Sequence, residues 1–201
     1  MFSLTAFLSY VFVTTFTPGP NNIMSMTNGN NFGYKKTLNF ILGVTSGFAV
    51  IMILCNYLNL LLVSFIPKIK IFMDILGVAY MLYLAIKILK SSSHAHNSQN
   101  KRLNTYTAGI TMQFVNPKVI LYGITVTSSF ILPYYHDLGT LLLFSIFFAF
   151  IAFVSTSCWA LFGSLFQKFL SKYNKLFNIA MALLLIYSAL SVPEVKHLLG
   201  F

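Results

Sequence analysis

The stretch Thr17-Pro18-Gly19-Pro20-Asn21-Asn22 (TPGPNN) lies inside an apolar N-terminal segment that is otherwise typical of a helix. A proline in a helix interior costs about 3 kcal/mol, and glycine is also unfavourable there. The stretch therefore predicts that the first helix is interrupted near its middle. Pro20 is suited to begin a new half-helix, because proline is common at the first helical position.

The composition predicts that this helix lies in a membrane. Of the 201 residues, 57% are hydrophobic and 8% are charged, whereas soluble domains are about 25% charged. The mean hydropathy is +0.79. Several apolar runs approach the roughly 20 residues that cross a bilayer core. We therefore expect an integral membrane protein.

Six apolar runs are candidate membrane spans, so the expected fold is an all-α membrane protein with one domain over 1–201. The runs cover about 4–27, 38–63, 70–89, 107–131, 139–163 and 176–193. The connections are short except for the polar loop 90–106. The segment 164–175 is expected to form a short amphipathic turn at the membrane surface.

The basic residues predict the orientation of these spans. Nine of the 13 Lys and Arg residues fall in the first, third and fifth connections: Lys35, Lys36, Lys87, Lys90, Lys101, Arg102, Lys168, Lys172 and Lys175. Three lie on the other side: Lys68, Lys70 and Lys196. Cytoplasmic loops carry the excess of basic residues. We therefore expect the loop 90–106 in the cytoplasm and both termini in the periplasm.

The formal net charge of +10 also raises the question of a nucleic-acid partner. Nucleic-acid-binding domains concentrate Lys and Arg in a patch or stripe. Here the basic residues are spread over short connections between apolar runs, and aromatic residues do not interleave with them. The pattern favours the lipid bilayer as partner and argues against nucleic acid.

The fourth span carries a second break, which reads Gln113-Phe114-Val115-Asn116-Pro117-Lys118. Each break lies about ten residues, or about 15 Å, from the expected cytoplasmic end of its helix. That depth is close to the midplane of a hydrocarbon core about 30 Å thick. The second broken helix comes three spans after the first, and three is an odd number, so the two halves cross the membrane in opposite senses. The pattern predicts two inverted three-helix repeats, about 4–89 and 107–193, with broken helices one and four.

Paired broken helices of this kind point to a transporter binding site, and incidental proline kinks are the alternative. The half-helix that begins at Pro20 offers free backbone N–H groups and a helix dipole, which favour an anion. The carbonyl groups before the break lose their helical partners and can accept hydrogen bonds from an ammonium group. We predict a site for a zwitterion made by Pro18, Gly19, Pro20, Asn21, Asn22, Gln113, Asn116, Pro117 and Lys118.

Lys118 is the ionisable residue expected near mid-membrane, where a lysine costs about 2.5–3.5 kcal/mol. The three acidic residues of the chain are expected elsewhere: Asp74 and Asp137 near the outer side, and Glu194 in the tail. A substrate carboxylate would pair with Lys118, and snorkelling of its stem toward the cytoplasm is the alternative. A cationic substrate would want a buried acid, so a small zwitterion fits better.

The same motifs resemble the LysE/RhtB family of bacterial amino-acid exporters. The similar stretches are TPGPNNIMSMTNGNNFGYKKT (17–37), LNFILGV (38–44), QFVNPKVILYG (113–123) and CWALFGSLFQ (158–167). They follow one another as in that family, over about residues 4–192, and resemble its cysteine/O-acetylserine exporters most. The resemblance implies six spans in the inner membrane and export of small neutral amino acids, cysteine and O-acetylserine among them. It implies neither an enzyme activity nor a cofactor.

Two other function classes are weighed on the histidine and cysteine positions. An intramembrane enzyme would need a histidine in a span, but the four histidines lie in connections or the tail: His94, His96, His136 and His197. The first two form an HxH in a polar loop, which favours a solvated loop over a metal site. A thiol-redox conduit would need cysteines at the breaks, whereas Cys55 and Cys158 lie elsewhere in spans two and five.

A membrane scaffold that transports nothing is the remaining alternative, although its helices would have no reason to break at the midplane. Gly43 and Gly47 form a GxxxG motif in the second span. Small residues at this spacing let two helices approach closely. We expect helix packing within the chain from this motif, and it is also compatible with a homodimer.

Overall fold

A computed structural model of the chain describes residues 3–90, 102–167 and 172–190, without the side chains of 60–74 and 174. Several features named above fall outside this description: most of the polar loop with His94 and His96, the side chain of Asp74, part of the turn at 164–175, and the tail with Glu194.

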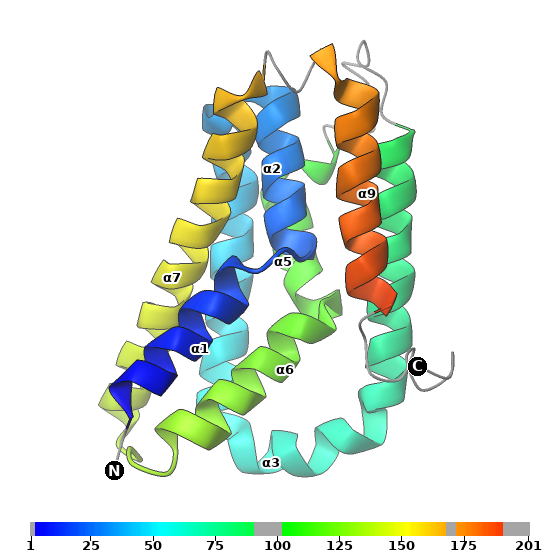
Figure 1. Cartoon of the computed structure of the whole chain (residues 1–201). Coiled ribbons are helices and arrows are strands. Elements are labelled where there is room, and N and C mark those ends of the chain that lie inside the picture. The colour runs from blue at the N-terminus through cyan, green and yellow to red at the C-terminus, as the bar shows by residue number, and fades with distance from the viewer. Residues whose placement is uncertain (1–2, 91–101, 168–171, 191–201) are drawn as a thin grey trace.

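The described chain is helical throughout its regular parts, which confirms the all-α class. Its helices are α1 (Leu4–Phe16), α2 (Pro20–Phe32), α3 (Tyr34–Leu89), α5 (Tyr106–Val115), α6 (Pro117–Val126), the π-helical turn η1 (Thr127–Ile131), α7 (Leu138–Leu165) and α9 (Asn174–Leu190). Figure 1 shows α7, α3 and α9 running along the length of the molecule, with α1 and α6 crossing it obliquely.

Two helical segments in the described chain are long and apolar enough to cross a membrane, Tyr34–Asn59 of α3 and Leu138–Leu165. The bent pair Tyr106–Val115 and Pro117–Ile131 would make a third. Three shorter apolar helices accompany them: Leu4–Phe16, Ile75–Leu89 and Lys175–Leu190. The chain is thus a membrane protein with two or three spans by length alone, and the arrangement in six spans stays a prediction.

The connection expected between the second and third spans is itself helical. Within α3, Leu58 has non-helical backbone angles (φ −110°, ψ 18°). Figure 1 shows α3 descending, crossing the base of the molecule and returning upward beside α9. The sequence placed a boundary near Lys68, where the hydropathy drops. Polar residues mark the edge of a span, but they do not by themselves end a helix.

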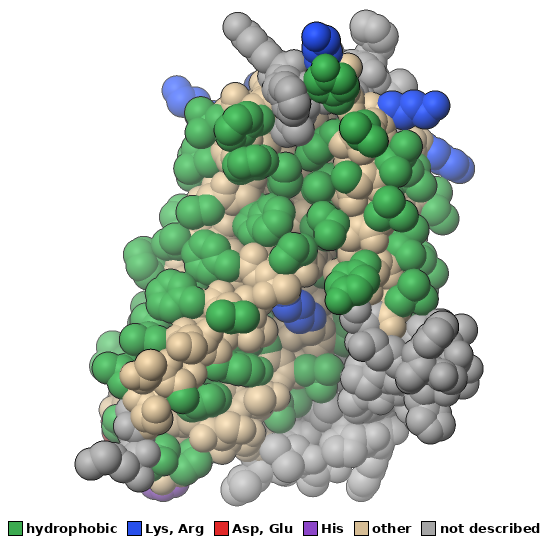
Figure 2. Space-filling model, in the orientation of Figure 1, with side chains coloured by type: hydrophobic (Ala, Val, Ile, Leu, Met, Phe, Trp, Pro, Cys, Tyr) green, Lys and Arg blue, Asp and Glu red, His purple; other side chains and the backbone are tan. Residues whose placement is uncertain are grey.

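Lys and Arg side chains gather at one end of the molecule, which we call the basic end (Figure 2). The described basic residues near this end are Lys35, Lys36, Lys87, Lys90, Arg102, Lys172 and Lys175. They lie where α2 meets α3, where α3 ends, before α5 and around the start of α9. Apolar side chains cover much of the rest of the face in Figure 2, as expected for a surface in contact with lipid.

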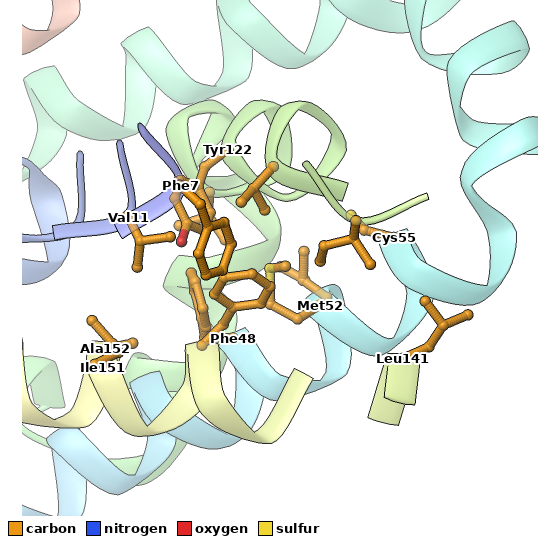
Figure 3. Close-up of a cluster of buried hydrophobic side chains, with 14 residues drawn as sticks. Phe7, Val11, Phe48, Met52, Cys55, Tyr122, Leu141, Ile151 and Ala152 are labelled. Carbon is orange, nitrogen blue, oxygen red and sulfur yellow. The ribbon is translucent and has the colours of Figure 1, made fainter. Parts of the chain in front are cut away.

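The half of the molecule away from the basic end is held by an aromatic and aliphatic core. Figure 3 shows side chains of α1, α3, α6 and α7 converging there, among them Phe7, Phe48 and Tyr122. Phe7 packs against four other phenylalanine rings at centroid distances of 5.8–6.1 Å. Cys55 is buried in the same core.

The half toward the basic end is held by a second apolar cluster, formed by side chains of α2, α3, α5 and α9, and by backbones in direct contact. A methyl group added to Gly43 of α3 would clash with the carbonyl oxygen of Tyr106, and one at Gly109 of α5 would clash with that of Phe40. The GxxxG motif therefore packs α3 against α5 of the same chain.

The second close contact joins α2 and α7. A methyl group on Gly29 would meet the carbonyl oxygen of Ala160, and one on Gly163 would meet that of Met26. Such contacts are typical of membrane helices that approach through small residues. Glycine contacts therefore fix α2 to α7 and α5 to α3, on the side of the breaks that faces the basic end.

Candidate substrate site

The two predicted breaks are present and lie next to each other. After α1, Thr17 is extended (φ −60°, ψ 141°), and Gly19 is the extended N-cap before Pro20 opens α2. After α5, Asn116 is extended (φ −94°, ψ 101°), and Pro117 opens α6. The axes of the second broken helix bend by 66°. Figure 1 shows both breaks near mid-height of the molecule.

The helices that begin at the breaks differ in how their first turn is capped. The Asn116 side chain accepts a hydrogen bond from the Lys118 backbone N–H at 3.1 Å, so α6 carries its own cap. The N-cap of α2 is Gly19, and no side chain of the described residues caps that helix. The first-turn N–H groups of a helix lack intrahelical acceptors. The start of α2 can therefore accept an anion, whereas the start of α6 is already capped.

The carbonyl groups at the end of α1 accept hydrogen bonds from polar side chains. Asn22 Nδ2 donates to the carbonyl oxygens of Thr15 (2.9 Å) and Thr17 (3.1 Å). The Ser155 hydroxyl of α7 donates to the carbonyl oxygen of Thr15 (3.0 Å), and Trp159 Nε1 donates to that of Phe16 (3.3 Å). The break thus presents a row of backbone acceptors, as the sequence predicts for a helix interrupted by proline.

Lys118 extends from the first turn of α6 to the opposite break. Its Nζ donates to the carbonyl oxygen of Thr17 at 3.2 Å. A methyl group built on Gly19 would lie 3.3 Å from the same Nζ, so the lysine stem lies along the glycine. The ammonium group is therefore at the first break and not at the basic end, which argues against simple snorkelling.

Asn21 and Gln113 join α2 to α5 through their side-chain amides. Asn21 Nδ2 donates to Gln113 Oε1 at 2.9 Å, and Gln113 Nε2 donates back to Asn21 Oδ1 at 3.1 Å. Gln113 is fully buried and also donates to the Gly109 carbonyl oxygen at 3.0 Å. We call this reciprocal pair the amide latch. It links the two broken helices on the side of the breaks that faces the basic end.

Two cavities meet at these groups. The smaller, of about 50 Å³, is lined by six predicted residues: Gly19, Pro20, Asn21, Asn22, Asn116 and Lys118. The larger, of about 430 Å³, is lined by four: Pro18, Pro20, Pro117 and Lys118. Gln113 reaches the smaller cavity only through its bond to Asn21. Among the described residues that line the two cavities there is no acidic side chain.

Several lining residues were not predicted from the sequence. The smaller cavity is also lined by Thr14, Thr15, Thr17, Phe48, Val119, Tyr122, Ala152 and Thr156. Tyr122 lies one helical turn after Lys118, so the period of the helix could have pointed to it. Phe48 and Ala152 come from α3 and α7, and no local motif marks them.

The two cysteines do not belong to this site. Cys55 is buried, Cys158 is exposed on α7, and both thiols are free. Neither residue lines one of the two cavities. A redox relay needs two thiols that can exchange, and this site does not contain them.

Comparison with known proteins identifies the scaffold that carries this site. Residues 12–192 match the family described as LysE type translocator. This chain belongs to the LysE type translocator family. It is therefore a transporter of the amino-acid efflux class and not an enzyme.

Curated relatives of this LysE-family chain align along almost its whole length. Proteins named cysteine/O-acetylserine efflux protein from Escherichia coli (strain K12) and Shigella flexneri serotype 5b (strain 8401) are each 35% identical to it. One from Escherichia coli O139:H28 is 36% identical. Each alignment spans 189 residues, which is 94% of this chain and 96% of the relative. No solved structure matches the chain significantly.

Proposed function

We propose that this LysE-family chain exports small neutral amino acids across the inner membrane, with cysteine and O-acetylserine as substrates. The observation that carries this proposal is the 50 Å³ cavity between the uncapped start of α2 and the ammonium group of Lys118. The names of the curated relatives support the two substrates.

The chemistry of the cavity suits both charges of an amino acid. A carboxylate would accept hydrogen bonds from the free N–H groups at the start of α2 and from Lys118, since helix N-termini and ammonium groups both favour anions. The substrate ammonium would donate to the carbonyl oxygens of Thr15 and Thr17, which in this structure accept hydrogen bonds from Asn22, Ser155 and Lys118. Because none of the described residues that line the cavity carries a carboxylate, the site suits a zwitterion better than a cation.

The proposal includes a membrane arrangement. Six spans would be formed by α1 with α2, the two arms of α3, α5 with α6 and η1, α7, and α9, as two inverted repeats joined by the loop 90–106. The basic end would face the cytoplasm, and both termini the periplasm, as the excess of basic residues favours. A homodimer would have to use a surface other than the Gly43 and Gly47 face, which α5 of the same chain covers.

Efflux of a panel of labelled amino acids from cells or loaded vesicles tests the substrate class. We expect faster loss of cysteine, O-acetylserine and other small neutral amino acids in the presence of this protein. Lysine and arginine should leave at the rate of control cells. Equal efflux of cationic and neutral amino acids would contradict the proposed chemistry of the site.

A further inference from the structure

We propose that substrate reaches the site from the basic end along one polar face of α2, and that the amide latch closes this route in the present structure. The face consists of Asn21, Ser25, Asn28 and Asn31, which we call the α2 stripe. This inference rests on the proposed function, since it assigns the cytoplasmic branch of an export route. The ligand is the same zwitterionic amino acid.

The spacing of the α2 stripe places its members on one side of the helix. Intervals of four, three and three residues keep side chains aligned in an α-helix. The stripe begins at the cavity, which Asn21 lines, and rises ten residues toward the basic end. At 1.5 Å per residue this is about 15 Å, or half of a hydrocarbon core. The stripe therefore covers the distance between the site and the basic surface.

The burial of this polar face is unusual for a static structure. Ser25 is 0% exposed and Asn28 is 2% exposed, although both side chains are polar. Among the described residues, the Ser25 hydroxyl has no hydrogen-bond partner, and the hydroxyl of Thr27 on the same helix lacks one too. Buried polar atoms are nearly always paired, so unpaired ones need an explanation. Contact with water or substrate in a second conformation supplies it.

The neighbours of the α2 stripe form a seam that can open. The glycine contacts described above fix the other side of α2 to α7, where Gly163 meets the Met26 carbonyl. On the stripe side, the side-chain hydrogen bonds among the described residues are few: the amide latch to Gln113, a long bond from Asn116 Nδ2 to Asn21 Oδ1 at 3.5 Å, and a bond from Asn28 Nδ2 to the Leu103 carbonyl oxygen at 3.2 Å. Separation of α2 from α5 along this seam would break these polar contacts and the apolar contacts in the cluster that Met24 and Met112 share, and it would leave the close glycine packing intact.

A small hollow lies at the end of the α2 stripe nearest the basic end, between α2, the end of α3 and Leu103. Its volume is about 10 Å³, close to the space that one water molecule needs. Thr27, Asn28, Asn31 and Lys87 are among the residues that line it. A lysine at the mouth of the route would attract the carboxylate of an incoming amino acid.

The amide latch has the chemistry of a gate for a zwitterion. Each amide offers a donor and an acceptor, so a substrate with a carboxylate and an ammonium group can replace both bonds between Asn21 and Gln113. The latch lies at the inner side of the 50 Å³ cavity, where the route would join the site. α2 begins at the first break and α5 ends at the second, which lets each move as a unit.

Cysteine accessibility in inside-out membrane vesicles tests the route. The background protein carries Cys55→Ala and Cys158→Ser, and Ser25→Cys, Asn31→Cys or Met26→Cys is added singly. The probe is a membrane-impermeant methanethiosulfonate. We expect Ser25→Cys to react about tenfold faster than the control Met26→Cys, because the Met26 backbone lies against Gly163 of α7 and its side chain is buried in an apolar cluster. Asn31→Cys should react fastest, since it lies nearest the basic end.

Two further measurements tie the labelling to the gate. O-acetylserine should slow the reaction of Ser25→Cys; it replaces cysteine here because cysteine would consume the reagent. Gln113→Ala should speed the reaction by opening the latch. Equal, slow reaction of Ser25→Cys and Met26→Cys, with no effect of Gln113→Ala, would overturn the route. Labelling as expected without efflux of any amino acid would instead refute the proposed function and leave the route standing.

Discussion

Lys118 and Gly19 define the chemistry of the site at the scale of single residues. Lysine supplies a positive charge from one broken helix, and glycine leaves the start of the other without a side-chain cap. The lysine stem passes so close to Gly19 that an added methyl group would touch its Nζ at 3.3 Å. The two positions therefore act together, although nearly one hundred residues separate them in the chain.

Replacement of Lys118 by Met tests the charge. The variant keeps a long apolar stem and removes the ammonium group. A charge-assisted hydrogen bond contributes about 1.5–3 kcal/mol, so export should fall about tenfold or more. Efflux of labelled substrate, normalised to inserted protein, is the measurement. Export within a few-fold of the parent protein would show that Lys118 does not hold the substrate.

The cysteines provide a residue-scale control on function. Cys55→Ala with Cys158→Ser should leave export per inserted molecule unchanged, because neither thiol reaches the cavities. Loss of the buried Cys55 side chain should lower protein abundance or thermal stability in detergent instead. Abolished efflux in a normally inserted double variant would favour thiol chemistry as the function.

At the scale of elements, the broken helices depend on proline and their neighbours depend on glycine. Pro20 and Pro117 each open a helix at a break. Gly29 and Gly109 each let a half-helix touch the backbone of a long helix. The prolines leave backbone polar groups without helical partners near the middle of the molecule. The glycine contacts fix the positions of the half-helices that carry these groups.

Pro20→Leu tests the first break as an element. Leucine restores a backbone N–H and favours a continuous helix, so the start of α2 would lose its role as an anion site. The variant should insert normally, since leucine lowers the cost of insertion. Export should fall sharply, whereas Asn22→Ala should have an intermediate effect because backbone donors remain. Normal efflux in Pro20→Leu would leave the proline break without a role in binding.

Gly109→Val tests the contact between α5 and α3. A side chain at this position would meet the backbone of Phe40 and Val44, and overpacking of this kind costs about 1–3 kcal/mol or more. The variant should unfold at a lower temperature in detergent. Gly139→Ala is the matched control, because its nearest contact would be an ordinary 3.5 Å to Asp137. Equal melting temperatures of the two variants would refute tight packing at Gly109.

The same elements show how far the sequence alone could predict the site. Pro18, Pro20 and Pro117 marked the breaks, because the effect of proline on a helix is local. The residues around the breaks, such as Phe48 and Ala152, depend on which helices pack together. Helix packing depends on glycines and apolar faces spread over the whole chain, so no short motif predicts which helices meet.

At the scale of the whole molecule, the charge distribution is strongly one-sided. Apart from Lys118, the described basic side chains lie toward the basic end, and the described acidic residue Asp137 caps α7 at the opposite end. The helix order and the two breaks could be predicted because hydropathy and proline act over short distances. The helical path of α3 through the second connection could not, since hydropathy marks the membrane boundary and not the end of a helix.

Reporter fusions test the proposed orientation. A fusion after residue 97 should report the cytoplasm, and a fusion at the C-terminus should report the periplasm. The expected opposite responses follow from the placement of basic residues on the cytoplasmic side. An alkaline-phosphatase and a fluorescent-protein reporter at each position make the measurement reciprocal. Matching responses at the two positions would contradict the six-span arrangement.

A site whose charged side chain is Lys118, with no acidic residue among the described lining residues, has a consequence for how export depends on the membrane voltage. A zwitterion adds no net charge to the site, so the loaded and the empty protein carry the same charge in the electric field. A cationic amino acid would add one, and moving an elementary charge across 100 mV involves about 2.3 kcal/mol. In a cell that is negative inside, the voltage would hold back the export of cations. Efflux of neutral amino acids from vesicles should therefore vary little when a potassium diffusion potential is applied.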